Sequence, residues 1–247
     1  MAGDDGEFTT ADAYHDLAQW YTQALGKQLA EEQCARLTPV LAGLFGYHLL
    51  QVGGYFGNLA QGRTSIRHCV SVSPTLPADV LAQPDALPIA TDSVDVVILP
   101  HTLEIEPRPH QVLREVERVL IPEGHVVIIG FNPWSIWGLW RWRPSLRGHM
   151  PWLGHFFSLA RIKDWLSLLD FEVTRTEIFF YRPPLQNESL LRRLRFIEYI
   201  GQRFFSFRGG IYIVVARKRV VTLTPLRRKN MTARRVLAPA GYAHHGG

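Results

Sequence analysis

Short apolar runs that alternate with helix-like stretches constrain the fold of this chain more than any other feature. The clearest of these runs, each bounded by turn-forming residues, are YHLLQVG (47–53), HCVSVS (68–73), VDVVILP (94–100) and HVVIIGF (125–131). Continuous apolar strands are typical of a parallel sheet that helices cover on both faces. The sequence therefore predicts an α/β fold, in which ligand-binding loops follow the carboxyl ends of the strands.

The segments between these runs carry helical periodicity. Residues 11–44 indicate two helices, with Gly26 and Pro39 as the expected interruptions. After Pro109, apolar residues recur on one face and charged residues on the other, which predicts an amphipathic helix. The other expected elements are helices at 157–169 and 189–205 and strands at 171–181 and 211–218.

The net charge of +5 belongs to one end of the chain. From Lys218 onward there are seven basic and no acidic side chains, and without these seven, 20 basic side chains remain against 22 acidic ones. We expect this tail, residues 218–247, to be mostly disordered, because it lacks apolar periodicity. A basic arm can also contact nucleic acid or an anionic membrane, and both alternatives stay open.

Composition narrows the class of protein further. Cys34 and Cys69 lie far apart and fit neither a disulfide framework nor a zinc site, and no metal is indicated elsewhere. The start, MAGDDGEF, does not have the order of a signal peptide. No apolar run approaches the roughly 18 residues of a membrane span. These features favour the cytoplasm as the location.

One block of the sequence resembles class I S-adenosylmethionine-dependent methyltransferases. Residues 85–131, DALPIATDSVDVVILPHTLEIEPRPHQVLREVERVLIPEGHVVIIGF, carry Asp-Ala-Leu-Pro where the family has an Asp-Ala-x-x-Leu-Pro segment, and then the family's Leu-Glu turn, its Arg-Val-Leu-x-Pro helix end and the strands around them, in the family's order. The resemblance implies a Rossmann-like, mostly parallel seven-stranded sheet. It also implies S-adenosyl-L-methionine as cofactor.

The resemblance assigns cofactor-binding roles residue by residue. In relatives, a glycine loop follows the first strand, an acid and an alanine recognise adenine, and residues after the fourth strand line the methionine side. The positions of this chain that correspond are Gln51, Gly53, Gly54, Tyr55, Gly57, Ser73, Asp85, Ala86, Leu87, Pro100 and His101. Glycine suits such a loop because a side chain would block the close approach of a ligand to the backbone.

Three of these positions depart from the family pattern. Gln51 stands where relatives have an acid, Tyr55 replaces a middle glycine, and Ser73 occupies the place of the acid that holds the ribose hydroxyls. Losing that carboxylate contact costs on the order of 1.5–3 kcal/mol if nothing replaces it. The short spacing between Ser73 and Asp85 also predicts that the helix found there in relatives is short or absent.

His101 and Glu104 are the candidate catalytic residues, because both follow the predicted strand 94–100 at its carboxyl end. Histidine can accept a proton near neutral pH, although methyl transfer needs a base only when the acceptor is protonated. His101 can instead contact substrate or cofactor, or be structural. Glu104 can equally be a surface or helix-capping carboxylate.

A segment rich in tryptophan and arginine, residues 131–157, follows the predicted strand 125–131. It contains five of the seven tryptophans, three arginines and no acid. The resemblance places the acceptor pocket here, so Asn132, Trp134 and Trp137 are candidate substrate-binding residues. Packing in the core and contact with a membrane surface are the alternatives.

The sequence thus divides into N-terminal helices (1–45), a methyltransferase-like domain (46–217) and the basic tail. The favoured function is methylation of a small apolar or aromatic acceptor by an S-adenosylmethionine-dependent enzyme. A catalytically inactive binding or scaffold protein is the first alternative, because of the altered positions. A nucleic-acid-associated methyltransferase is the second. Neither the acceptor nor the oligomeric state follows from the sequence.

Overall fold

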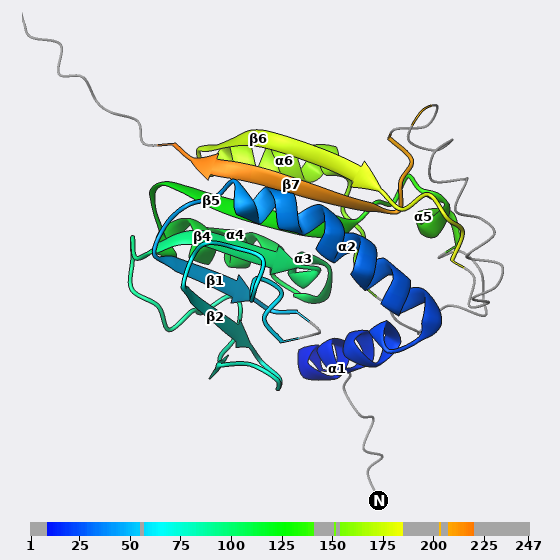
Figure 1. Cartoon of the computed structure of the whole chain (residues 1–247), viewed down its shortest axis with the longest axis horizontal. Coiled ribbons are helices and arrows are strands. Elements are labelled where there is room, and N and C mark those ends of the chain that lie inside the picture. The colour runs from blue at the N-terminus through cyan, green and yellow to red at the C-terminus, as the bar shows by residue number, and fades with distance from the viewer. Residues whose placement is uncertain are drawn as a thin grey trace, which may run out of the picture.

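The computed structural model describes residues 9–54, 57–140, 151, 154–184, 203 and 207–219. These residues form a twisted sheet between two layers of helices (Figure 1). The strands are β1 (His48–Val52), β2 (His68–Ser73), β3 (Val80–Leu81), β4 (Val94–Pro100), β5 (Leu120–Phe131), β6 (Phe171–Phe179) and β7 (Ile211–Lys218). The helices are α1 (Thr10–Tyr21), α2 (Ala24–Ala42), α3 (Thr102–Ile105), α4 (Pro109–Val119), α5 (Ile136–Trp140) and α6 (Leu159–Leu168).

The sheet has seven strands in the order β3-β2-β1-β4-β5-β7-β6. Strands β1 to β5 run parallel, whereas β7 is antiparallel to both β5 and β6. The predicted Rossmann-like fold with a mostly parallel sheet is confirmed. Because β1, β2, β4 and β5 are parallel, their carboxyl ends meet at one edge, which we call the carboxyl edge.

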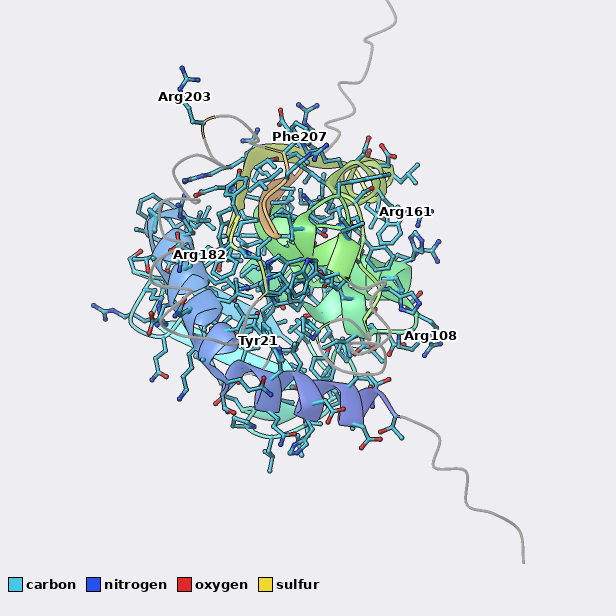
Figure 2. The ribbon with its side chains drawn as sticks, turned by 90° about the vertical axis from the view of Figure 1, so that its right-hand side faces the viewer. Tyr21, Arg108, Arg161, Arg182, Arg203 and Phe207 are labelled. Carbon is cyan, nitrogen blue, oxygen red and sulfur yellow. The ribbon has the colours of Figure 1, made fainter. Side chains whose placement is uncertain are left out.

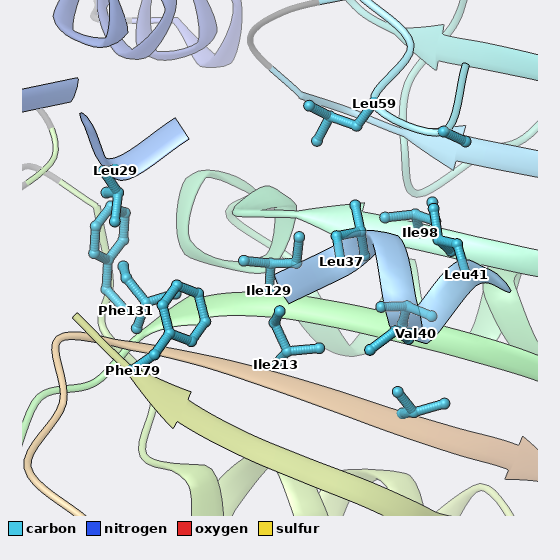
Figure 3. Packing of buried hydrophobic residues seen from close by; sticks show 14 of the residues in the cluster. Leu29, Leu37, Val40, Leu41, Leu59, Ile98, Ile129, Phe131, Phe179 and Ile213 are labelled. Carbon is cyan, nitrogen blue, oxygen red and sulfur yellow. The ribbon is translucent and has the colours of Figure 1, made fainter. Parts of the chain in front are cut away.

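Alternate residues of each strand point into two separate cores. On one face, Ile98 and Ile129 pack against Leu37 and Leu41 of α2, as Figure 3 shows, and Leu49 belongs to the same cluster. On the other face, the neighbouring strand residues pack against the apolar sides of α4 and α6. Burial on both faces explains why these strands appear in the sequence as continuous apolar runs.

The N-terminal helices break at a different place from the predicted one. The chain leaves the helix at Thr22, whose hydroxyl donates to the carbonyl of Gln19, and α2 begins two residues later. Pro39 lies inside α2, so the interruption predicted there is wrong. Near a helix end, proline removes one backbone hydrogen bond without ending the helix. Gly26 lies in the first turn of α2, where a Cβ would be 2.5 Å from the backbone of Trp20.

Other predicted elements agree with the structure, and some cannot be compared. The strands expected at 68–73, 94–100 and 211–218 are β2, β4 and β7, and the helix expected at 157–169 is α6. Of the helix expected at 189–205 only residue 203 is described, and the tail beyond residue 219 lies outside the described residues. The first two basic residues of the tail contact the body: Lys218 pairs with Asp92 at 3.0 Å and Arg219 with Glu172 at 2.7 Å. Among the described helices, none is long and apolar enough to span a membrane.

Candidate functional site

A glycine-containing loop leaves β1 at the carboxyl edge. Gly53, Gly54 and Gly57 have φ angles of 72°, 118° and 51°, a region that favours glycine. A Cβ at Gly53 would lie 2.7 Å from the hydroxyl of Thr102 and 2.8 Å from that of Tyr14, so the backbone runs tightly beneath these side chains. A Cβ at Gly57 would have no described residue within 4 Å, so the described part of the loop leaves space there.

Gln51 holds this loop in place. Its Nε2 donates to the carbonyl oxygens of Gly53 (3.1 Å) and Gly57 (2.6 Å), and its Oε1 accepts from the amide of Leu59 (2.7 Å). Both the nitrogen and the oxygen of the buried Gln51 amide are therefore bonded to the loop that follows β1. Tyr55, the other altered position of the loop, lies outside the described residues.

The end of β2 presents no free carboxylate. The buried Ser73 accepts a hydrogen bond from the amide of Thr75 through its hydroxyl (3.3 Å). Asp79 is the nearest acid in the following turn, but its Oδ2 accepts from both the amide and the hydroxyl of Ser71, each at 2.7 Å. These hydrogen bonds lower the pKa of Asp79. Residues 74–93 contain no helix, as the sequence predicted.

The adenine-side positions are also engaged within the protein. Asp85 Oδ2 lies 2.5 Å from Nη2 of Arg108, whose side chain is 73% exposed and points to solvent at the periphery (Figure 2). The amide of Ala86 donates to the carbonyl of Gln83 (3.1 Å), and the amide of Leu87 donates to Glu115 (2.9 Å). Of these contacts, the Asp85–Arg108 pair is the easiest for a ligand to replace, because its guanidinium side is exposed, although the Asp85 side chain is only 10% exposed.

His101 is fully buried directly after β4. It has a φ of 57°, a strained conformation that clusters at functional sites, and its ring packs on Phe131 with centroids 4.2 Å apart. Its Nε2 lies 3.0 Å from the hydroxyl of Tyr21 and 2.8 Å from the Nε2 of Gln33. The N-terminal helices thus supply two polar partners that sequence reasoning missed, because nothing in the sequence shows which residues of α1 and α2 face β4.

Glu104 is a buried carboxylate on α3, 3% exposed. Its Oε1 accepts from the amide of Phe131 (2.8 Å) and lies 3.9 Å from His101 Nδ1, while its Oε2 has no hydrogen-bond partner among the described residues. Burial and the neighbouring Glu104 charge raise the pKa of Tyr212. The two predicted catalytic residues therefore do lie together beneath the carboxyl edge.

A second buried carboxyl group, Glu106, was missed by sequence reasoning. It is 4% exposed and accepts a hydrogen bond from the hydroxyl of Tyr14 on α1 (3.0 Å). Burial raises the pKa of Glu106 to about 7. Glu106 lies two residues after Glu104 in the same sequence block, which could have suggested a place in the site. The same position also fits a residue on the surface, so the sequence alone does not decide.

The three predicted substrate-binding residues have different environments. Trp134 is 74% exposed, whereas Trp137 is 1% exposed and donates through Nε1 to the carbonyl of Arg182 (2.9 Å). Trp137 therefore fills the core instead of facing an acceptor. Asn132 is also buried, and its Nδ2 donates to the carbonyls of Phe207 and Gly209, both at 2.9 Å. Pro100 is buried at the end of β4, and Trp142, Trp152 and the arginines at 141, 143 and 147 lie outside the described residues.

Comparison with known proteins agrees with this architecture. The family model described as "Methyltransferase domain" matches residues 50–128. The uncharacterized protein YafS of Escherichia coli (strain K12) is 37% identical over 216 residues, which are 86% of this chain and 83% of YafS. The chain belongs to the class I S-adenosylmethionine-dependent methyltransferases.

Solved structures share the fold of this chain at low sequence identity. A chain from the complex between the Haloferax volcanii Trm112 methyltransferase activator and its methyltransferase has a TM-score of 0.59 at 14% identity, covering 86% of this chain and 98% of that one. A SAM-dependent methyltransferase from Thermotoga maritima has a TM-score of 0.53 at 14% identity, covering 82% and 92%. The [4+2]-cyclase SpnF has a TM-score of 0.53 at 18% identity, covering 75% and 80%. These likenesses establish the fold alone.

The residues at the carboxyl edge fit S-adenosylmethionine on one side better than on the other. At Gly57 no described residue blocks the approach of a ligand to the backbone, and the oxygen of buried Glu104 that has no partner among the described residues suits a cationic ligand. On the ribose side, Ser73 offers a hydroxyl that already accepts a hydrogen bond. No group of three or more potential metal ligands occurs among the described residues.

Proposed function

We propose that this protein methylates a small, apolar or aromatic acceptor with S-adenosylmethionine as methyl donor. The observation that carries the proposal is Glu104, a buried carboxylate with an unpartnered oxygen beside His101. An unsatisfied buried carboxylate in a protein of this family calls for a cationic partner. S-adenosylmethionine supplies a methyl group on a positively charged sulfur.

The residues of the site have distinct roles in this proposal. The hydrogen bonds of Gln51 hold the glycine loop in one conformation, so the loop loses less conformational freedom when the ligand binds. Glu104 attracts the cation, and His101, fixed between Tyr21 and Phe131, positions this carboxylate. Methyl transfer then depends mostly on alignment and exclusion of water.

An acceptor that carries a proton also needs a base. His101 Nε2 already lies within hydrogen-bonding distance of Tyr21 and Gln33. Glu106 is the better candidate, because its pKa of about 7 matches proton transfer near neutral pH. Its hydrogen bond to Tyr14 keeps it close to the glycine loop.

Calorimetric titration with S-adenosylmethionine and S-adenosylhomocysteine tests the proposal, since only the former carries the sulfonium charge. Glu104→Gln should weaken S-adenosylmethionine binding about tenfold and S-adenosylhomocysteine binding much less. Glu31→Gln, a change at an exposed position of α2, should alter neither. Absence of binding at millimolar cofactor would contradict the proposal.

Asp85→Ala tests the adenine side separately. Loss of its hydrogen bond to the cofactor should weaken both ligands by about 1–3 kcal/mol. An unchanged affinity would remove Asp85 from the site. Comparing the two variants separates recognition of the sulfonium from recognition of the nucleoside.

A protein of this fold that does not transfer methyl groups is the second candidate. Ser73 in place of the family's acid favours it, and SpnF shows that the fold also houses a [4+2]-cyclase. In that case binding of either nucleoside fails, or binding occurs without turnover of any acceptor. Methylation of nucleic acid remains a further proposal that rests on the basic tail. It predicts affinity that falls steeply with salt and disappears on removal of residues 218–247.

A further inference from the structure

Two adjoining hollows open beside the carboxyl end of β5. One has a volume of about 320 Å³ and lies against Ile136 and Leu139 of α5. The other has a volume of about 410 Å³ and lies against Leu159 of α6 and Phe207. Trp134 and Arg208 line both hollows. A single ligand can therefore contact both sides of this shared wall.

The walls of the hollows are apolar and open to solvent. Trp134, Leu139 and Phe207 are 74%, 70% and 60% exposed, a grouping that is unusual unless something covers it. Figure 2, which faces the carboxyl edge, shows Phe207 at the upper rim of the molecule. Each volume lies at the lower end of the range for small-molecule sites.

The polar side chains that line the hollows are already bonded within the protein. Asn132 donates to the carbonyls of Phe207 and Gly209, and Ser135 donates to the carbonyl of Asn132 (2.6 Å). Ser158 accepts from the amide of Arg161 as the N-cap of α6. These hydrogen bonds fix the side chains in the walls, and Asn132 and Ser135 have their donors engaged within the protein.

Arg208 is different, because it is exposed and forms no ion pair or hydrogen bond with any residue that the structure describes. Its guanidinium lies over the ring of Phe207, 5.5 Å from the centroid. No acidic residue is among the described residues that line either hollow. A guanidinium favours carboxylate and phosphate groups, since it offers paired donors to their oxygens.

We propose that these hollows bind an amphiphile with an anionic head group. Arg208 pairs with the carboxylate or phosphate, while Trp134, Leu139 and Phe207 cover the apolar body. That the bound molecule is the methyl acceptor rests on the proposed function: Asn132 directly follows Phe131, whose amide bonds Glu104, so the hollows and the cofactor side meet at this edge. The binding itself does not depend on that function.

Calorimetric titration of the full chain with dodecyl phosphate, kept below its micelle concentration, tests the site. Arg208→Gln should weaken binding about tenfold, and Trp134→Ala should weaken it to a similar extent. Arg67→Gln is the matched control, because Arg67 is exposed and directly precedes β2 at the opposite end of the sheet. Dodecyltrimethylammonium should bind more weakly than dodecyl phosphate.

The inference is overturned if dodecyl phosphate does not bind, if Arg208→Gln leaves its affinity unchanged, or if the cationic amphiphile binds equally well. A second arm uses vesicles of phosphatidylcholine with and without phosphatidylglycerol. Sedimentation with the anionic vesicles, lost in Arg208→Gln, identifies a bilayer as the source of the ligand, whereas binding of the free amphiphile alone identifies a dissolved one.

The cofactor titration keeps this inference separate from the proposed function. Binding of dodecyl phosphate without binding of S-adenosylmethionine supports the amphiphile site and contradicts methyl transfer. The reverse result contradicts the amphiphile site alone. Because Arg208 and Trp134 are both exposed, neither substitution should affect folding, and the far-ultraviolet circular dichroism should stay unchanged.

Discussion

The two halves of the carboxyl edge use their polar side chains in opposite ways. Around β1 and β2, Gln51, Ser73 and Asp79 all bond to the backbone or side chains of their own loops. Around β4 and β5, Glu104 keeps one unpartnered oxygen and the pKa of Glu106 is raised to about 7. Gln51 and Ser73, two of the positions that depart from the family pattern, thus bond within the protein, whereas the buried carboxyl groups Glu104 and Glu106 lie in the other half.

The largest expected effect is at Gly130, in the half around β4 and β5, where the backbone of β5 lies against the Glu104 carboxylate. A Cβ at Gly130 would lie 2.6 Å from Glu104 Oε1 and would overlap the hydroxyl of Tyr212. Gly130→Ala should lower the free energy of unfolding by about 3 kcal/mol, measured by urea denaturation. Gly57→Ala is the control in the first half, where the site is open and only backbone strain of about 1 kcal/mol is expected. Equal losses of stability in Gly130→Ala and Gly57→Ala would contradict the difference between the two halves.

The next effect tests whether Gln51 is structural. Gln51→Glu restores the residue type of relatives, but it places a carboxylate against the carbonyls of Gly53 and Gly57 and removes two donors. We expect the free energy of unfolding to fall by about 2–3 kcal/mol. Gln61→Glu, at an exposed position of the same connection, should change it by less than about 0.5 kcal/mol. If Gln51→Glu leaves the free energy of unfolding unchanged, the hydrogen bonds of Gln51 do not hold the loop.

The fold could be predicted from the sequence because burial leaves a local signal. Strands such as β4 are covered on both faces, so nearly every residue of 94–100 is apolar, and the expected bounds agree with the structure. The break between α1 and α2 could not be predicted in this way. It depends on the hydroxyl of Thr22 bonding back to Gln19 and on how closely Gly26 approaches Trp20, neither of which has a distinctive pattern.

The site could be predicted only in part. The block 85–131 identified His101 and Glu104, which do lie together. Their partners Tyr21 and Gln33 come from helices distant in the sequence, and only packing brings them to His101. Trp134 and Trp137 are three residues apart in one segment, yet one is exposed and the other buried, because Trp134 lies before the short helix α5 whereas Trp137 lies on its buried side.

The third effect is the pH dependence of Glu106. Its pKa in the folded protein, about 7, lies above the ordinary value of 4.5, so the folded state binds the proton more tightly than the unfolded state. The stabilisation is complete below about pH 4.5 and is lost as the pH rises through about 7. The free energy of unfolding should therefore fall by about 2 kcal/mol between about pH 5.5 and 7.5.

Glu106→Gln should remove this slope, as measured by urea denaturation across the same pH range. Glu31→Gln, at an exposed site, should preserve it. A slope that persists in Glu106→Gln would assign the titration to another group and would weaken the role of Glu106 as base.

The smallest effect concerns the boundary between the two halves, where Asp85 pairs with Arg108. Because the guanidinium side chain is 73% exposed, Arg108→Ala should change the free energy of unfolding by less than about 1 kcal/mol. It should instead strengthen S-adenosylmethionine binding slightly, about twofold, since Asp85 is released for the cofactor. Arg67→Ala is the control for a general loss of positive charge.

The opposite result of Arg108→Ala would group Asp85 with Gln51 and Ser73, whose side chains bond within the protein. If Arg108→Ala costs more than about 2 kcal/mol of stability and leaves the cofactor affinity unchanged, the pair holds the 85–88 turn as Gln51 holds the glycine loop. If affinity rises while stability stays constant, Asp85 belongs with Glu104 and Glu106 among the groups kept for a ligand. Calorimetry and urea denaturation on the same two variants distinguish these outcomes.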